Sequence, residues 1–283
     1  MRFDRTGKVS LDGIYTQPDP RAYFTTLREL DYYIPQLAKP YFQQIIGQYR
    51  QSRQVAVPTV VDIGCSYGVN AALLRCDATM DDLYDRYAGA ECTRQALLER
   101  DRELVRAHRF PARFVGLDVS RPALGYASAA GFLDDAVQAD LEAREPTARQ
   151  RALLAGADIV ISTGCLGYVT GRTLVRVVGS RRDRLPWMAH FALRMFPFEP
   201  IADSLAALGY DTMRVNRTFR QRRFASDREQ RQVLETMSAA GVDPEGLEND
   251  GWLYAQLYVS RPIGTPDPLT FDDDQSLTQK AAR

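Results

Sequence analysis

The sequence predicts an α/β fold, in which helices cover both faces of a doubly wound, mainly parallel sheet of seven strands. Three observations predict it. Short segments rich in branched apolar residues alternate with helix-favouring segments along most of the chain. The first apolar segment, 59–64, continues directly into a glycine loop and a helix rich in small residues. Two later apolar segments end close to an aspartate, Asp118 and Asp140.

Residues 1–57 are expected to form a helical lid ahead of the sheet. Apolar side chains recur there at helical spacing, and Pro35 and Pro40 should each end or kink a helix, so two or three short helices are expected. The main domain is expected over 58–262. The remaining 263–283, rich in proline and aspartate near its start, is expected to be a flexible tail.

Within the main domain, the apolar segments and the helix signals set the order of the elements. A polar, helix-favouring stretch, 76–109, separates the first strand from the second and is interpreted as a helical insertion. Strands are expected at 59–64, 112–120, 135–141, 157–163, 186–196, near 210–223 and at 252–260. Helices are expected near 68–75, from 121 onward, and near 146–155, 170–180, 199–209 and 227–241.

The overall composition excludes several classes of function. Basic and acidic side chains number 36 each, which does not indicate a nucleic-acid partner or an acidic membrane surface. The four cysteines form no C-x-x-C pair and there are two histidines, so no metal site is expected. The first residues have no apolar core typical of a signal peptide, and no apolar run approaches a membrane-spanning length. We therefore expect a cytoplasmic protein.

The glycine loop lies in VVDIGCSYGVNAALL, residues 60–74. A dinucleotide fingerprint, G-x-G-x-x-G, counted from Gly64, would require glycine where Ser66 and Val69 stand. A second pattern, acid-x-G-x-G-x-G, departs only at Ser66, since Asp62, Gly64 and Gly68 all match it. The loop therefore favours the second pattern.

With this loop the chain resembles the class I S-adenosylmethionine-dependent methyltransferases, a Rossmann-like superfamily, over about residues 58–262. The resemblance implies S-adenosylmethionine as cofactor, with Asp62 near its amino group and Asp118 on its ribose hydroxyls. It also implies that Asp140 faces the adenine amino group, with Leu141 packed on the ring. The complete set of cofactor-binding residues implied is Asp62, Gly64, Cys65, Ser66, Gly68, Asp118, Val119, Asp140, Leu141, Thr163, Gly164, Cys165, Tyr15 and Tyr23.

Candidate catalytic side chains are mostly aromatic. Tyr15 and Tyr23 precede the sheet, and similar N-terminal helical lids with an aromatic pair occur in the branch that this sequence resembles. Aromatic faces can hold a sulfonium and exclude water, although tyrosines here could equally pack the helices onto the sheet. Tyr168 follows the fourth strand on the sulfonium side. His190, in the fifth strand, is a candidate base or a packed strand histidine.

The loop after the fourth strand, STGCLGYV, lacks the Asn/Asp-Pro-Pro-aromatic motif of methyltransferases that act on amino groups of nucleic acids and glutamine. No acidic cluster like that of catechol-type enzymes stands out, so a small, apolar, enclosed pocket is expected. Three hypotheses follow. The first is methyl transfer to a small-molecule acceptor in biosynthesis, in specialised metabolism. The second is cyclisation of S-adenosylmethionine to azetidine-2-carboxylate and methylthioadenosine, since azetidine-2-carboxylate synthases resemble methyltransferases. The third is a non-catalytic module that binds the cofactor.

Overall fold

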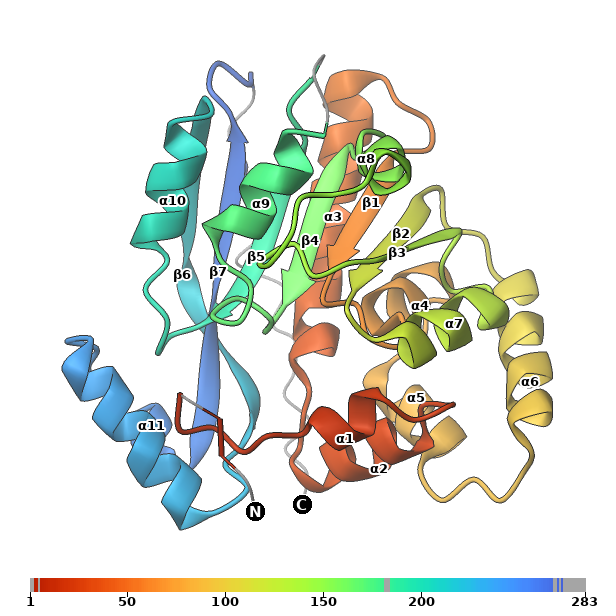
Figure 1. The fold of residues 1–283 in the computed structure, drawn as a ribbon, viewed down its shortest axis with the longest axis horizontal. Coiled ribbons are helices and arrows are strands. Elements are labelled where there is room, and N and C mark those ends of the chain that lie inside the picture. The colour runs from red at the N-terminus through yellow and green to blue at the C-terminus, as the bar shows by residue number, and fades with distance from the viewer. Residues whose placement is uncertain (1–2, 5, 181–183, 267–268, 270, 272–283) are drawn as a thin grey trace.

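The computed structural model describes residues 3–4, 6–180, 184–266, 269 and 271. Within them, seven strands form a single sheet in the order β3-β2-β1-β4-β5-β7-β6. The pairs among β1 to β5 are parallel, whereas β7 runs antiparallel to both of its neighbours. The predicted doubly wound α/β fold is confirmed (Figure 1). The strands are β1 Thr59–Ile63, β2 Arg113–Asp118, β3 Asp135–Gln138, β4 Ile159–Thr163, β5 Trp187–Leu193, β6 Tyr210–Arg223 and β7 Trp252–Pro262.

Strand β1 lies where the strand order reverses. It pairs with β2 on one side and with β4 on the other, and four of its five residues are buried. Branched apolar residues suit such a position because both faces of a parallel strand are covered by helices. The connections from β1 and β4 leave this point toward opposite faces of the sheet, which opens a crevice at the carboxyl ends of the two strands.

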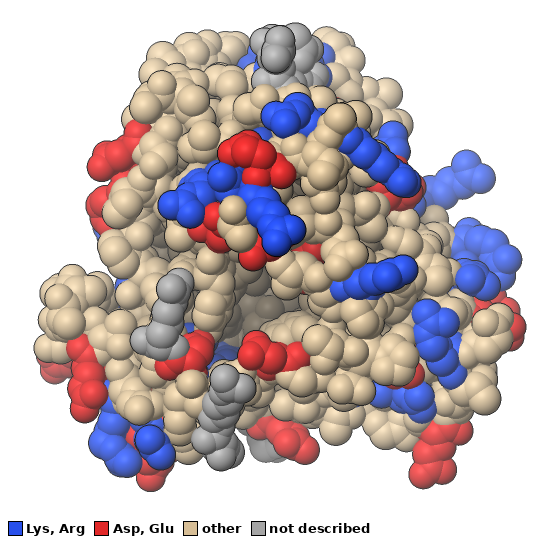
Figure 2. All heavy atoms as spheres, in the orientation of Figure 1, with Lys and Arg blue, Asp and Glu red and all other residues tan. Residues whose placement is uncertain are grey.

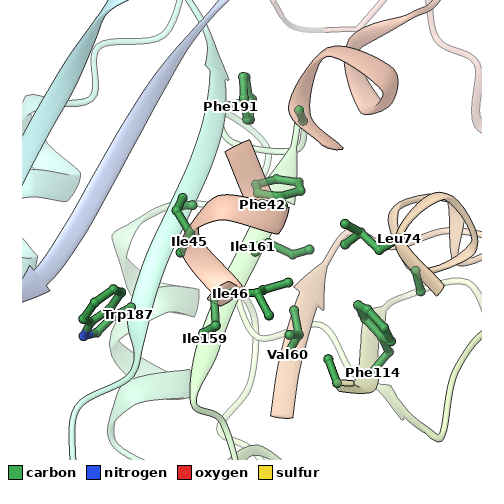
Figure 3. Packing of buried hydrophobic residues seen from close by; sticks show 14 of the residues in the cluster. Phe42, Ile45, Ile46, Val60, Leu74, Phe114, Ile159, Ile161, Trp187 and Phe191 are labelled. Atoms are coloured by element: carbon green, nitrogen blue, oxygen red, sulfur yellow. The ribbon is translucent and has the colours of Figure 1, made fainter. Parts of the chain in front are cut away.

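Helices cover both faces of the sheet. One face is covered by α8 Ala148–Leu154, α9 Gly171–Val178 and α10 Glu199–Ala206, and the other face by α3 Ile34–Arg53 among others. Phe42, Ile45 and Ile46 of α3 lie against Ile159 and Ile161 of β4 (Figure 3). Helices α4 Val69–Arg75 and α7 Arg121–Ala130 complete the α3 side.

Helix α3 differs from the expected short lid helices. Pro35 lies in its first turn, where a missing N–H costs little, but Pro40 lies inside the helix without ending it. Of the two outcomes expected at Pro40, an end or a kink of the helix, the end does not occur. An interior proline costs about 3 kcal/mol, and each fully buried Phe or Ile contributes roughly 1.5–3 kcal/mol, so the buried face outweighs it. Helix α3 covers one face of the sheet, in contact with β4 and β5.

The rest of the N-terminal region packs on the insertion. Helices α1 Asp12–Tyr15 and α2 Arg21–Glu29 lie beside α5 Met80–Tyr87, and α6 Arg94–Ala107 follows (Figure 1). The stretch 76–109 thus holds the two helices α5 and α6, each starting at a threonine whose hydroxyl caps it. Phe24 of α2 stacks on Tyr87 of α5 with ring centroids 4.7 Å apart.

The C-terminal part of the chain packs against the N-terminal residues. Helix α11 Asp227–Ala239 lies near the first residues of the chain, which run from it to α1 (Figure 1). Much of the expected tail, 267–268, 270 and 272–283, lies outside the described residues. Of those described, Leu269 is buried and the ring of Phe271 lies 5.1 Å from that of Tyr41, so these two pack on the core. No described helix is both long enough and apolar enough to cross a membrane.

Candidate active site

A cavity of about 700 Å³ lies at the carboxyl ends of the central strands, within the usual size range of ligand sites. Its floor comes from the loops after β1, β2, β3 and β4, and its roof from residues 4–32. Gln221 and Arg222 of β6 close one end. Figure 2 shows this face of the molecule hollowed near its centre.

The loop after β1 forms a tight turn under the cavity. Gly64, Ser66 and Gly68 all have positive φ, at 67°, 50° and 76°. A Cβ on Gly64 would lie 2.7 Å from the Cβ of Cys165, so only glycine fits there. Ser66 adopts the left-handed conformation that the pattern normally reserves for glycine, and it does so at some conformational cost. Gly68 lies just outside the cavity, as the N-cap of α4.

Ser66 carries an unsatisfied group. Its side chain is 5% exposed, and its Oγ has no hydrogen-bond partner among the described residues. A buried hydroxyl without a partner costs free energy, so it normally marks a position where a water or ligand binds. Ser66 lines the cavity together with its neighbours Gly64 and Cys65.

Asp118, at the end of β2, is held firmly in place. Its Oδ2 accepts the main-chain N–H of Ser66 and its Oδ1 accepts that of Ser120, both at 2.8 Å. Each carboxylate oxygen keeps a further lone pair, and the side chain lines the cavity beside Val119. This arrangement can accept two hydroxyl protons from a vicinal diol.

Asp140 lies on the cavity wall after β3, with buried Leu141 next to it. One of its oxygens, Oδ1, accepts the N–H groups of Glu142 and Ala143. The other remains available to a donor in the cavity. The expected pairing of an acid with an adjacent apolar contact is therefore present at this wall.

Asp62 does not line the cavity. It is fully buried, and both of its oxygens lie within 3.2 Å of Nδ2 of Asn70, which in turn lies 3.1 Å from the hydroxyl of Thr163. Burial raises the pKa of Asp62 to about 7, with a further rise from Asp118 and an opposing effect of the Asn70 bond. Asn70 and Thr163 line the cavity, so they lie between Asp62 and its interior.

Three tyrosines enclose the same end of the cavity. The ring of Tyr23 lies 5.7 Å from that of Tyr15 and 6.5 Å from that of Tyr32, and all three line the cavity. Burial raises the pKa of Tyr15 to about 12, and it also raises the pKa of Tyr23 and Tyr32, so their hydroxyls stay neutral. The ring of Tyr67 lies outside the cavity lining, with its centroid 5.7 Å from that of Tyr23.

His190 lies away from the cavity. It is fully buried in β5, where Nδ1 lies 2.8 Å from the hydroxyl of Ser162. Burial lowers the pKa of His190 to about 3, which keeps the ring neutral. Because His190 has no contact with the cavity, the structure favours the packed strand histidine over the candidate base.

The loop after β4 lies directly against the β1 loop in the floor of the cavity. A Cβ on Gly164, whose φ is 77°, would lie 2.3 Å from Nε2 of Gln221. Cys165 donates its thiol to the carbonyl of Ile63 at 3.2 Å, and burial raises its pKa to about 12, so it is no nucleophile. Tyr168 bonds to Asp4 of the N-terminal segment. Thr163, Gly164, Cys165 and Tyr168 all line the cavity.

Several lining residues carry no sequence signal. Asp4 and Lys8 come from the first turn of the chain, and Gln221 and Arg222 come from β6. Arg222 is buried and donates to both oxygens of Glu229, at 2.6 and 3.0 Å. Only contacts between distant parts of the chain bring these residues to the cavity. No group of three or more His, Cys, Asp or Glu that could hold a metal ion occurs in the described part of the chain.

No family model matches the sequence, and no curated protein matches it either. The chain is similar to the solved structure of magnesium protoporphyrin IX methyltransferase from Synechocystis PCC 6803 with bound SAM, at 13% identity, 79% coverage of both chains and a TM-score of 0.38. It is also similar to a plantazolicin methyltransferase in complex with SAH, at 11% identity, covering 89% of this chain and 93% of that one, with a TM-score of 0.42. A SAM-dependent methyltransferase from Aquifex aeolicus matches at 9% identity, over 89% and 99% of the two chains, with a TM-score of 0.39. The strand order itself defines the fold of this chain as a doubly wound, Rossmann-like sheet with its cavity at the switch point.

Proposed function

We propose that this chain is a transferase that uses S-adenosylmethionine to methylate a small-molecule acceptor of specialised metabolism. The observation that carries this proposal is the setting of Asp118, a carboxylate oriented by two main-chain N–H groups toward the cavity. A charged acceptor fixed in this way suits the ribose diol of the cofactor. Asp140 and Leu141 then suit the adenine, at the next strand end.

The methionine half of the cofactor would lie over the β1 loop. The free hydroxyl of Ser66, the amide of Asn70 and the hydroxyl of Thr163 offer polar contacts for an amino acid group. Asp62, behind Asn70, becomes ionised above about pH 7 and would favour a cationic amino group through space. The residues present therefore fit the cofactor at both ends.

When bound, S-adenosylmethionine supplies an electrophilic methyl group on a sulfonium. The protein contributes alignment and exclusion of water. The rings of Tyr15, Tyr23 and Tyr32 present π-faces and neutral hydroxyls, which tolerate a cation without supplying a competing nucleophile. We propose that residues 3–33, with α1 and α2, form the lid that closes over the bound molecules.

Methyl transfer is favoured over cyclisation by the extent of the cavity. Beyond the β4 loop it continues to Asp4, Lys8, Tyr168 and Arg222, past the residues assigned to the cofactor. An enzyme that cyclises its cofactor needs no such space, whereas a methyltransferase needs it for the acceptor. Cyclisation to azetidine-2-carboxylate remains the second candidate, because three tyrosine rings gather where an enclosed sulfonium would lie.

Incubation with S-adenosylmethionine, alone and with a panel of small acceptors, separates the candidates by mass spectrometry of the products. Methyl transfer predicts S-adenosylhomocysteine only when an acceptor is present. Methylthioadenosine with azetidine-2-carboxylate, formed without any acceptor, would establish cyclisation instead. Tight binding with no turnover would indicate a non-catalytic module, and failure to bind S-adenosylmethionine or S-adenosylhomocysteine in calorimetry would reject the whole assignment.

A further inference from the structure

Lys8 is a buried cation at the end of the cavity next to α11. Its side chain is 7% exposed, and it lines the cavity. Its Nζ lies 4.8 Å from the centroid of the Tyr168 ring, yet it makes no hydrogen bond or ion pair with any described residue. Buried ammonium groups are normally paired, because an unpaired charge in such a place is costly.

The acids that could neutralise Lys8 are already engaged. Oδ1 of Asp4 accepts the N–H and hydroxyl of Thr6 and the main-chain N–H of Lys8 itself, and Oδ2 accepts the hydroxyl of Tyr168. Asp4 thus accepts four hydrogen bonds, none of them from Nζ of Lys8.

Glu229, the other acid near Lys8, is equally committed. Its two oxygens accept two bonds from Arg222 and the main-chain N–H groups of Val9 and Ala225. Arg222 is likewise committed to this pair, so it offers no free charge to a ligand. The three N–H donors of Lys8 are therefore the free cationic donors at this end of the described cavity.

We propose that Lys8 is the anion-binding group of the acceptor subsite, and that the methyl acceptor carries a carboxylate that binds its Nζ. This inference rests on the proposed function, since it places the acceptor beyond the cofactor. A monoanion fits better than a phosphate, because one ammonium is available while Asp4 and Glu229 stand close by and would repel a second negative charge. The hydroxyl of Tyr168 and its ring border the same space.

The charge state of Lys8 agrees with this role. Burial, with Arg222, lowers its pKa to about 8, while Asp4, Glu229 and Cys165 act in the opposite direction. The ammonium is thus the main form at neutral pH, and a carboxylate beside it should raise its pKa. Binding of the anionic group should weaken as the pH rises above about 8.

The small number of lysines makes a direct test possible. The sequence has only Lys8, Lys39 and Lys280, so ¹³C-lysine labelling gives three ε-methylene signals in an NMR spectrum. We expect benzoate to shift the Lys8 signal and to raise its titration midpoint, whereas the neutral analogue benzamide should do neither. The spectra are recorded with and without S-adenosylhomocysteine. An unchanged Lys8 signal with benzoate, or an equal response to benzamide, would overturn the proposal.

Variants of Lys8 and Lys39 provide a matched comparison of benzoate binding. Lys8→Met should weaken benzoate binding in calorimetry by at least about tenfold, the loss of one charge-assisted bond, while Lys8→Arg should largely retain it. Lys39→Met is the control, because Lys39 is just as buried, at 8% exposed, but is paired with Asp77 outside the cavity. If benzoate binds Lys8 but S-adenosylhomocysteine does not bind, the proposed function fails and the anion site stands. If S-adenosylhomocysteine binds but benzoate does not, the anion site fails and the proposed function stands.

Discussion

Glu229 accepts the main-chain N–H of Val9 at 2.8 Å, although 220 positions separate the two residues in the sequence. Thr236, further along α11, donates to the carbonyl of Thr6, and Arg228 lies over the ring of Phe3. Helix α11 thus holds the N-terminal segment over the cavity. The buried carboxylate of Glu229 thus serves both the N-terminal segment, at Val9, and Arg222, which it neutralises.

Replacing Glu229 by alanine should release the segment and leave Arg222 buried without its partner. Breaking a buried pair typically costs about 3–5 kcal/mol, so we expect a loss of that order in the free energy of unfolding by urea. Hydrogen exchange at residues 6–11 should accelerate as well. Glu235→Ala, on the exposed side of the same helix, is the control and should change neither quantity. Unchanged exchange at 6–11 in the Glu229→Ala variant would show that the segment is held by other contacts.

Replacing Asp118 by alanine should weaken binding of S-adenosylhomocysteine by roughly 1.5–3 kcal/mol, because a charged acceptor of the ribose hydroxyls is lost. The measurement is isothermal titration calorimetry. Since Asp118 also orders Ser66 and Ser120, unfolding by urea is measured in parallel to separate lost binding from lost folding. Asp211→Ala, an exposed aspartate of β6, serves as control. An affinity equal to that of the unchanged protein would contradict the ribose assignment.

Asp62 should make stability depend on pH. Its pKa is about 7 in the folded protein against an ordinary 3.8, so the folded state binds more protons between these values. Its contribution is present in full below about pH 4 and is lost as the pH rises through 7, with a steepest slope of about 1.4 kcal/mol per pH unit.

The difference in unfolding free energy between the protein and its Asp62→Asn variant isolates this effect from that of His190. The pKa of His190 is lowered, so its contribution is lost in the opposite direction, as the pH falls from about 6.5. We expect the Asp62→Asn variant to gain relative stability steadily from pH 4 to pH 8. A constant difference over that range would show that Asp62 titrates normally.

Alanine variants at Gly164 and Gly89 separate the cost of backbone strain from the cost of a steric clash. Both have positive φ, 77° and 72°, so alanine should cost each about 1–2 kcal/mol in the free energy of unfolding. At Gly89 nothing lies within 4 Å of the new Cβ, whereas at Gly164 it would meet Nε2 of Gln221. We therefore expect Gly164→Ala to cost about 1–3 kcal/mol more and to weaken binding of S-adenosylhomocysteine. Equal losses in both variants would mean that Gln221 moves aside freely.

The parts of the fold that were predictable are those with local causes. The strand and turn from Thr59 to Gly68 follow from a branched run and from Gly64 and Gly68, which accept positive φ without strain, and the sheet order confirms the fold class. The continuation of α3 through Pro40 was not predictable, because helix propensity is local, whereas the buried face that outweighs it comes from packing on β4 and β5.

The residues that line the cavity likewise divide into those that the sequence marks locally and those that it does not. Asp118 and Asp140 were predictable because Asp118 ends β2 and Asp140 follows β3 by two residues, both at the carboxyl ends of parallel strands. Lys8 and Gln221 were not, because nothing near them in the sequence marks them and only the paths of α11 and β6 bring them to the cavity. His190 illustrates the converse: a chemically suitable residue in a strand can point into the core, which no periodicity in a fully buried strand reveals.

The bond between Val9 and Glu229 also bears on how the protein is made. A ribosome that adds about 5–20 residues per second needs roughly 10–40 s to pass from one partner to the other. During that interval the apolar and charged groups of the first turn have no α11 to contact. The segment around Val9 can thus reach its final place, and close the site, only after α11 has been synthesised.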